Sequence, residues 1–154
     1  MKLVLQRVAR ASVAVAGETV GAIGPGLLLL LGVAEGDDEA EARRFAAKTA
    51  ELRIFNDAEG RFNLSLTDVA GEALVISEFT LIADVRRGRR PAFNDAARPE
   101  AAQPVYEAYA GALEALGIHV ERGRFGAHMD IDLLADGPVT IVIDSADLDR
   151  ARRA

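Results

Sequence analysis

Hydroxyl and carboxylate side chains lie together in one short segment, Ser77-Glu78-Phe79-Thr80. A serine or threonine hydroxyl attacks an ester efficiently only when an adjacent base takes its proton. The two histidines of the chain, His119 and His128, are not placed beside these hydroxyls by any sequence spacing. Hydroxyls at the end of a strand also serve as hydrogen-bond partners of backbone groups. Two interpretations are therefore open: Ser77 or Thr80 is a nucleophile, or both hydroxyls have structural or positioning roles.

A second segment of chemical interest is the turn Asp136-Gly137-Pro138, which separates two predicted strands. Residues 129–133 alternate between apolar and acidic, as in a strand with one buried face, and residues 140–143 form a more apolar strand. Glycine tolerates positive φ and proline fixes φ, so the spacing alone predicts an ordinary hairpin turn. A Gly-Pro bond adopts the cis form at a cost of only about 0.5–1 kcal/mol, and a cis bond lets a tight turn aim its carbonyl groups outward.

The segment 83–94 is irregular and strongly basic, because four arginines fall between positions 86 and 90. Such a charge run either contacts the phosphates of a nucleic acid or forms a solvated loop that offsets an acidic chain. The net charge of −6 argues against nucleic-acid binding driven by overall charge, but not against a local basic patch. The candidates for phosphate contact are Arg86, Arg87, Arg89 and Arg90.

The composition excludes several classes of site. The chain contains no cysteine, so disulfides, thiolate nucleophiles and cysteine-ligated metals are ruled out. Its two histidines do not have a metal-ligand spacing, so we expect neither a metal nor another cofactor. No signal-peptide pattern opens the chain, and the longest apolar block, Leu27–Leu31, is far too short to cross a bilayer. We therefore expect a cytoplasmic protein without a membrane partner.

The elements that must position these segments are strands and two helices. The length of 154 residues predicts one domain, residues 1–154, with a loose polar tail at residues 147–154. The order of the patterns predicts a single compact α/β domain of mixed α+β character, with mixed β-sheets and two main helices. Helices are predicted from the cap residues Asp37 and Asp38 to Leu52, and from Pro99 to Leu116. Strands are predicted at residues 2–15, 19–23, 27–33, 73–81 and 118–121, and on both sides of the turn. Residues 27–33 contain no polar residue, as in a strand that is buried on both faces.

Three segments together resemble the D-aminoacyl-tRNA deacylase family. Residues 77–81 are Ser-Glu-Phe-Thr-Leu and are similar to the Ser-Gln-Phe-Thr-Leu motif of the family. Residues 137–140 match its Gly-Pro-Val-Thr motif, and residues 125–129 match its Phe-Gly-Ala-x-Met run. The opening Met-Lys-x-Val-x-Gln-Arg-Val and the Arg-Pro-Ala-Phe stretch at 90–93 are also similar. The similarity extends in order over nearly the whole chain.

The resemblance implies the fold of the family and an enzyme that hydrolyses the ester joining a D-amino acid, or glycine mischarged on tRNA(Ala), to the terminal adenosine of tRNA. It implies a homodimer in which the Gly137-Pro138 turn of each subunit, oriented by Arg7, enters the active site of the other and excludes L-amino acids. The catalytic segment would consist of Ser77, Glu78, Phe79 and Thr80. The substrate-binding residues would be Gly137, Pro138, Val139, Thr140, Phe125, Gly126, Ala127, Met129 and Arg7.

Two positions depart from the family pattern. Glu78 stands where the motif has glutamine, and Ala135 replaces the asparagine usually found before Asp-Gly-Pro. For the chemistry, the resemblance favours positioning of the ester, with the ribose 2′-OH and water assisting and backbone N–H groups near Phe79 and Thr80 facing the oxyanion. Two other functions stay open: a small-molecule esterase that uses Ser77 or Thr80 as nucleophile, and a non-enzymatic dimeric interaction module that uses the Gly-Pro turn as a contact.

Overall fold

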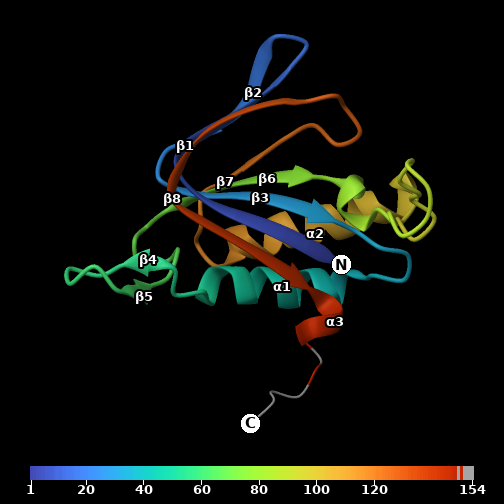
Figure 1. The fold of residues 1–154 in the computed structure, drawn as a ribbon. Coiled ribbons are helices and arrows are strands. Elements are labelled where there is room, and N and C mark those ends of the chain that lie inside the picture. The colour runs from blue at the N-terminus through green and yellow to red at the C-terminus, as the bar shows by residue number, and fades with distance from the viewer. Residues whose placement is uncertain (149, 151–154) are drawn as a thin grey trace.

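The computed structural model describes residues 1–148 and 150. Its central sheet consists of β1 (Lys2–Val15), β2 (Glu18–Ile23), β3 (Gly26–Gly32), β6 (Glu72–Ser77), β7 (Val120–Arg122) and β8 (Asp130–Asp144) (Figure 1). The strand order is β2-β1-β3-β6-β7, and β8 pairs with β1 as well. β3, β6 and β7 run parallel to one another, whereas β1 is antiparallel to β2, β3 and β8. The predicted fold of mixed α+β character with a mixed sheet is confirmed.

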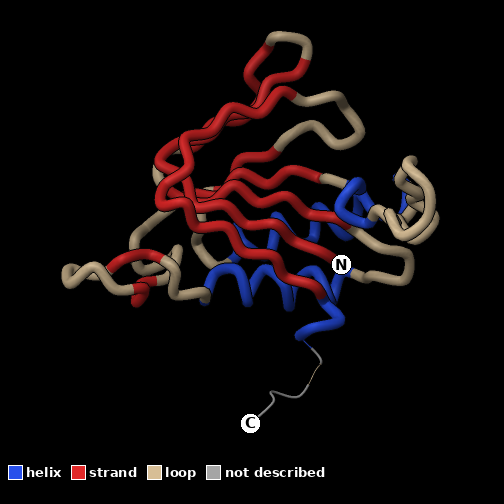
Figure 2. The backbone as a smooth tube through the Cα atoms, in the orientation of Figure 1, coloured by secondary structure: helices blue, strands red, loops and turns tan. Residues whose placement is uncertain are grey.

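β3 is the middle of a layered structure and is buried on both faces, as its unbroken run of leucines predicts. The helices α1 (Glu39–Glu51) and α2 (Pro99–Ala115) lie on one side of the sheet, where Leu27, Leu29 and Leu31 join the main core. On the other face, Leu28 and Leu30 belong to a second cluster, formed where β1, β2 and β8 curl over the sheet (Figure 2). Alternate side chains of one strand therefore serve two cores.

β8 shows that the predicted hairpin around Gly137-Pro138 is wrong. Its two halves do not pair with each other; both pair with β1, one after the other along its length. Val8 pairs with Ala135 and Gln6 pairs with Thr140, so residues 136–139 are extra residues that bulge out between the halves. β1 is 14 residues long and offers an edge for both halves, a tertiary feature that local spacing does not reveal.

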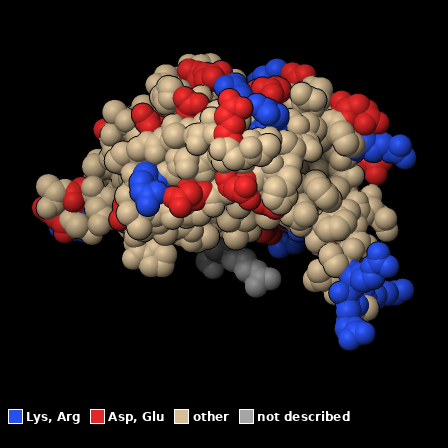
Figure 3. Space-filling view, turned by 90° about the horizontal axis from the view of Figure 1, so that it is seen from above, with Lys and Arg blue, Asp and Glu red and all other residues tan. Residues whose placement is uncertain are grey.

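The predicted strand 73–81 extends too far. β6 ends at Ser77, and a 3-10 helix, η1 (Phe79–Ile82), follows. The N–H of Glu78 still donates to the carbonyl of Leu31 at 2.8 Å, but β3 ends one residue later, so the chain beyond has no strand to pair with. The irregular basic loop comes next: residues 85–90 are all exposed, and a group of basic side chains protrudes at one end of the molecule (Figure 3).

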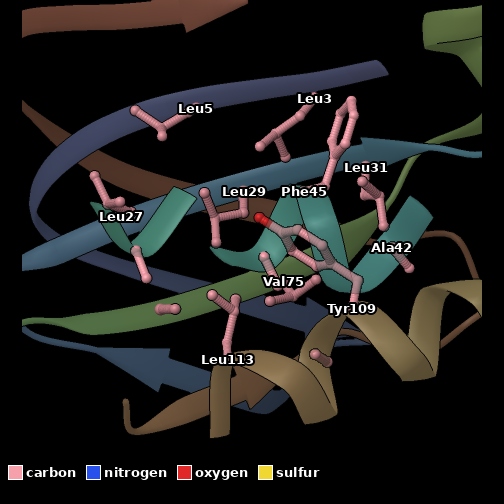
Figure 4. Packing of buried hydrophobic residues seen from close by; sticks show 14 of the residues in the cluster. Leu3, Leu5, Leu27, Leu29, Leu31, Ala42, Phe45, Val75, Tyr109 and Leu113 are labelled. Atoms are coloured by element: carbon pink, nitrogen blue, oxygen red, sulfur yellow. The ribbon is translucent and has the colours of Figure 1, made fainter. Parts of the chain in front are cut away.

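The two helices pack on each other as well as on the sheet. Asp38 caps α1 as predicted, because its side chain accepts a hydrogen bond from the N–H of Glu41 at 2.9 Å. Phe45 of α1 and Tyr109 of α2 are completely buried among the leucines of the sheet (Figure 4). The Tyr109 hydroxyl lies 2.8 Å from Oγ1 of Thr49, whose own proton is donated to the carbonyl of Phe45. The tyrosine is therefore the donor in this buried contact.

The C-terminal part of the described chain is a short helix, α3 (Ser145–Leu148). A loose tail is predicted for residues 147–154. Residues 147 and 148 belong to α3, and residues 149 and 151–154 lie outside the described residues. Within the described part of the chain, no helix combines the length and the apolar character needed to span a bilayer.

Candidate active site

A pocket of about 600 Å³ opens where the chain leaves the parallel strands β3, β6 and β7. Its wall contains residues that follow each of these strands: Val33 after β3, the segment from Ser77 to Thr80 at the end of β6, and the segment from Phe125 to Met129 after β7. Phe93 and the first turn of α2 complete it. The carboxyl ends of parallel strands are the common place for a ligand site, because the loops diverge there and leave a crevice.

The four residues predicted as the catalytic segment all line this pocket. The Thr80 hydroxyl donates a hydrogen bond to Oε1 of Glu78 at 2.6 Å. Phe79 is 56% exposed, and its ring packs edge-on against Phe93 with 5.0 Å between the ring centroids. His128 also lines the pocket, but its side chain is 93% exposed and contacts neither hydroxyl. Among the described residues, the Glu78 carboxylate is therefore the only base hydrogen-bonded to Thr80.

The pocket is also lined by four residues of the Phe-Gly-Ala-x-Met segment, namely Phe125, Gly126, Ala127 and Met129. Phe125 packs on Tyr106 with 5.8 Å between the ring centroids. The Tyr106 hydroxyl in turn donates to the carbonyl of Val75 at 2.9 Å, which fixes this segment to β6. Burial raises the pKa of Tyr106 above its ordinary range, so the phenol is a neutral donor at physiological pH. Segments about fifty residues apart in the sequence thus line one cavity.

The extra residues of β8, Asp136–Val139, form a protrusion that we refer to as the elbow. The Gly137–Pro138 peptide bond is cis. Both residues are exposed, whereas Val139 is 8% exposed and belongs to the main core. Gly137 has a φ of 133°, and a Cβ atom there would lie 2.8 Å from the backbone nitrogen of Val139. Only glycine fits this position without rearrangement. The elbow therefore presents main chain to the exterior while one end of it is buried.

Arg7 of β1 contacts the elbow at its first residue. Its Nε donates to the carbonyl of Asp136 at 3.1 Å, and its Nη1 donates to the carbonyl of Ile54 at 2.7 Å. The guanidinium carbon also lies 5.9 Å from the ring centroid of Phe55 and 5.6 Å from that of Phe62. These rings belong to the short hairpin of β4 (Phe55–Asn56) and β5 (Phe62–Leu64). Arg7 is buried and links the elbow to this hairpin.

Two residues that the sequence did not single out also hold the elbow. Nε2 of Gln6 donates to the carbonyl of Val139 at 3.2 Å, and the Thr140 hydroxyl donates to Oε1 of Gln6. Oδ1 of Asn56 accepts from Nη1 of Arg7 at 3.3 Å. Adjacent residues of a strand point to opposite faces of the sheet. The alternation of residues along β1 therefore gives no reason to expect that Gln6 and Arg7 both contact the elbow. The only signal is that Gln6 lies in the opening stretch that is similar to the family.

Within one chain, the elbow and the pocket are separate. Gly137, Pro138, Val139 and Thr140 are not among the residues that line the pocket, and neither is Arg7. The described residues also contain no cluster of three or more histidine, aspartate or glutamate side chains that could hold a metal ion.

The four arginines of the basic loop also lie away from the pocket. Nη2 of Arg86 donates to Oδ2 of Asp84 at 2.7 Å, and this guanidinium holds the pKa of Asp84 well below its usual range. Arg87, Arg89 and Arg90 are exposed and have no ion-pair partner in the described part of the chain. Three cations of the loop are thus available to an anionic partner.

These features define a class of protein: a small α+β protein with a ligand pocket at the ends of parallel strands and a firmly held, exposed main-chain elbow. The chain matches the family described as D-Tyr-tRNA(Tyr) deacylase over residues 4–144. It is 63% identical over 146 residues to the D-aminoacyl-tRNA deacylase of Roseiflexus sp. (strain RS-1), with 95% of this chain and 94% of that protein covered.

Two solved structures are similar. The c-Myc DNA Unwinding Element Binding Protein superimposes with a TM-score of 0.88 at 38% identity, over 94% of this chain and 99% of that one. A probable eukaryotic D-amino acid tRNA deacylase shares the fold, with a TM-score of 0.79 at 15% identity over 92% and 97% of the two chains. The chain belongs to the D-aminoacyl-tRNA deacylase family, whose members are hydrolases that act on ester bonds. The resemblance stated from the sequence motifs is thereby confirmed.

Proposed function

We propose that this protein hydrolyses the ester bond of D-aminoacyl-tRNA and so removes D-amino acids from tRNA in the cytoplasm. The observation that carries the proposal is that two motif segments of the family, Ser77–Thr80 and Phe125–Met129, line one cavity of about 600 Å³. A cavity of this size is in the range that accommodates a small ligand. Because the chain belongs to the deacylase family, we infer that this ligand is an amino acid esterified to the terminal adenosine of tRNA.

The active unit is a homodimer in which the elbow of each subunit enters the pocket of the other. The exposure of Gly137 and Pro138 supports this arrangement. β8 also leaves apolar side chains exposed, namely Leu133 at 39%, Leu134 at 51% and Val142 at 69%. Among the described residues, β8 pairs with β1 alone, so its outer edge is open. Open strand edges and exposed apolar side chains favour association with another chain.

The elbow excludes L-aminoacyl groups by steric clash. Arg7 binds the carbonyl at its start and Gln6 binds the carbonyl of Val139 at its end, so the main chain cannot move away from an approaching side chain. Such a wall tests only the side of the α-carbon from which the side chain projects. It therefore accepts many different D side chains. Glycine has no side chain to clash, so glycine mischarged on tRNA(Ala) is also a substrate.

Catalysis depends mainly on positioning: the two motif segments hold the ester while the ribose 2′-OH assists and water attacks. A covalent route through Thr80 has one observation in its favour, the 2.6 Å hydrogen bond to Glu78. A carboxylate is a far weaker base than the imidazole that activates most hydroxyl nucleophiles. The second candidate function, a small-molecule esterase with Thr80 as nucleophile, rests on that contact.

The basic loop contacts the tRNA. Its exposed side chains Arg87, Arg89 and Arg90 bind phosphates of the tRNA, whether the ester is hydrolysed by water or through Thr80.

Side-by-side deacylation of D-Tyr-tRNA, L-Tyr-tRNA and Gly-tRNA(Ala) tests the function. We expect the D-Tyr and glycyl esters to be hydrolysed and the L-Tyr ester to persist. Hydrolysis of L-Tyr-tRNA at the rate of D-Tyr-tRNA would contradict the proposal.

Thr80→Ala separates the two candidate mechanisms. Under the positioning mechanism, kcat falls by no more than about tenfold, whereas loss of a nucleophile costs roughly a thousandfold or more. An acyl-enzyme trapped on Thr80, together with RNA-independent turnover of simple esters, would support the esterase instead.

A further inference from the structure

The pocket of this protein carries a charge that the family motif does not imply. Glu78 stands where the motif has glutamine, and an ionised carboxylate only accepts hydrogen bonds, whereas an amide also donates them. Among the described residues that line the pocket, Glu78 is the only acidic one, and none is arginine or lysine. His128, the other titratable residue of the wall, is 93% exposed and faces Asp130 at 3.5 Å. The pocket is therefore suited to a cationic group.

Glu78 is also fixed in place for contact with a ligand. Its backbone N–H donates to the carbonyl of Leu31 at 2.8 Å, which ties the residue to the end of β3. Its Oε1 accepts the Thr80 hydroxyl at 2.6 Å, which holds the carboxylate on the pocket wall. No arginine, lysine or histidine of the described chain forms an ion pair with Glu78. The remaining lone pairs of the carboxylate are thus free to accept hydrogen bonds from a substrate.

We propose that the Glu78 carboxylate binds the protonated α-amino group of the aminoacyl ester. This inference rests on the proposed function. An aminoacyl ester has one cation common to every amino acid, the α-ammonium group, and that cation lies one carbon from the scissile carbonyl. A hydrogen bond between two ionised groups is about twice as strong as one between neutral groups. Glu78 is therefore a specificity-determining residue for a free amino group, and Thr80 is a positioning residue that acts through it.

The test compares two esters and two proteins. One ester is D-Tyr-tRNA, and the other is its analogue with an α-hydroxyl in place of the α-amino group. The proteins are the wild type and Glu78→Gln, which keeps the shape of the side chain and removes its charge. We expect the preference of the wild type for the amino ester, as a ratio of kcat/KM values, to fall about tenfold in the variant, chiefly through KM. Differences in the intrinsic reactivity of the two esters cancel in this comparison.

Three further variants sharpen the comparison. Glu18→Gln removes an exposed negative charge from β2, and we expect it to affect both esters equally. Thr80→Val should lower the preference for the amino ester, and Thr80→Ser should keep it, because serine retains the hydroxyl. Glu78→Ser gives the same comparison if Glu78→Gln proves unstable.

The outcomes are distinct for the two proposals. An unchanged preference for the amino ester in Glu78→Gln would overturn the role of Glu78 while leaving the deacylase function intact. An equal loss of activity on both esters would overturn it in the same way and indicate a general base instead. If the wild type hydrolyses neither ester, the proposed function itself fails.

Discussion

Nε of Arg7 donates a hydrogen bond of 3.1 Å to the main-chain carbonyl of Asp136. The donor lies on the first strand of the sheet and the acceptor lies at the start of the elbow, far along the chain. Because Arg7 is only 6% exposed and also binds the carbonyl of Ile54, it cannot move without breaking other contacts. One buried cation therefore fixes an exposed stretch of backbone.

Arg7→Lys is expected to lower kcat/KM for D-Tyr-tRNA about tenfold or more and to destabilise the fold by about 1–3 kcal/mol. Lysine keeps the charge but lacks the planar fork that reaches Asp136 and Ile54 together. Deacylation kinetics and urea unfolding measure the two effects. Arg10→Lys is the control, because Arg10 is exposed on the same strand and its pair with Asp132 contributes at most about 1 kcal/mol. Equal effects of the two substitutions would contradict the role of Arg7.

Gly137→Ala is expected to destabilise the protein by about 1–3 kcal/mol and to narrow the ratio of D-Tyr to L-Tyr hydrolysis. Its φ is 133°, and the added Cβ would lie 2.8 Å from the nitrogen of Val139, so the elbow must shift. Gly17→Ala is the matched control: Gly17 has a φ of 81° with nothing within 4 Å of the added atom. It should cost only about 1–2 kcal/mol of backbone strain and leave the ratio unchanged. A ratio unaffected by Gly137→Ala would argue against a main-chain filter.

Stability is expected to fall as the pH rises above about 10, the ordinary pKa of tyrosine. Burial raises the pKa of Tyr109 and of Tyr106 above that value, so the folded protein keeps protons that the unfolded chain releases. Full stability is therefore present below the unfolded pKa and is lost as the pH rises toward the folded one. For each tyrosine, the free energy of unfolding can fall by at most about 1.4 kcal/mol per pH unit, because one proton is released on unfolding. Urea unfolding over a series of alkaline pH values measures this slope.

Tyr109→Phe provides the control for the alkaline effect. The chain contains two tyrosines and no tryptophan, so the substitution should halve the slope. At neutral pH it should cost about 1 kcal/mol, because Oγ1 of Thr49 loses its donor. The prediction would be contradicted if tyrosinate absorbance appeared near the ordinary tyrosine pKa of about 10 while the protein was still folded.

Arg87→Ala combined with Arg89→Ala is expected to weaken tRNA binding and to reduce the slope of log Kd against log salt by about 1–2. Both side chains are exposed and lack an ion-pair partner among the described residues, so a phosphate is a suitable partner. Binding at several salt concentrations measures the slope. Arg43→Ala combined with Arg61→Ala removes the same charge from exposed side chains that pair with glutamates elsewhere, and it should leave the slope unchanged. If the loop variant behaves like this control, the loop is merely solvated.

The parts of the fold that depend on local chemistry follow from the sequence. The run Leu27–Leu31 has no polar position, which is compatible only with burial on both faces, and β3 is buried in that way. Asp38 before a helical pattern supplies the side-chain oxygen that a first helical turn requires. The motif segments at 77–80 and 125–129 do meet in one pocket, although the roles of their residues stay predictions.

The remaining features depend on contacts between distant segments. The spacing around Gly137-Pro138 predicts a hairpin, because it contains no sign that β1 is long enough to pair with both halves of β8. The predicted strand includes residues 78–81, yet they leave the sheet because the neighbouring β3 ends at Gly32. The contact of Gln6 with Val139 depends on the same bulge. Such features require knowledge of which strands are neighbours.

The strand β1 pairs with β2, β3 and β8 and also supplies Gln6 and Arg7 to the elbow. The elbow is therefore held by side chains of a strand that contributes to both cores, so unfolding of that strand also releases the elbow. Under the proposed function, a partly unfolded copy in which β1 detaches is expected to lose hydrolysis together with discrimination between D- and L-aminoacyl groups. Deterioration would then yield an inert protein and not an indiscriminate esterase.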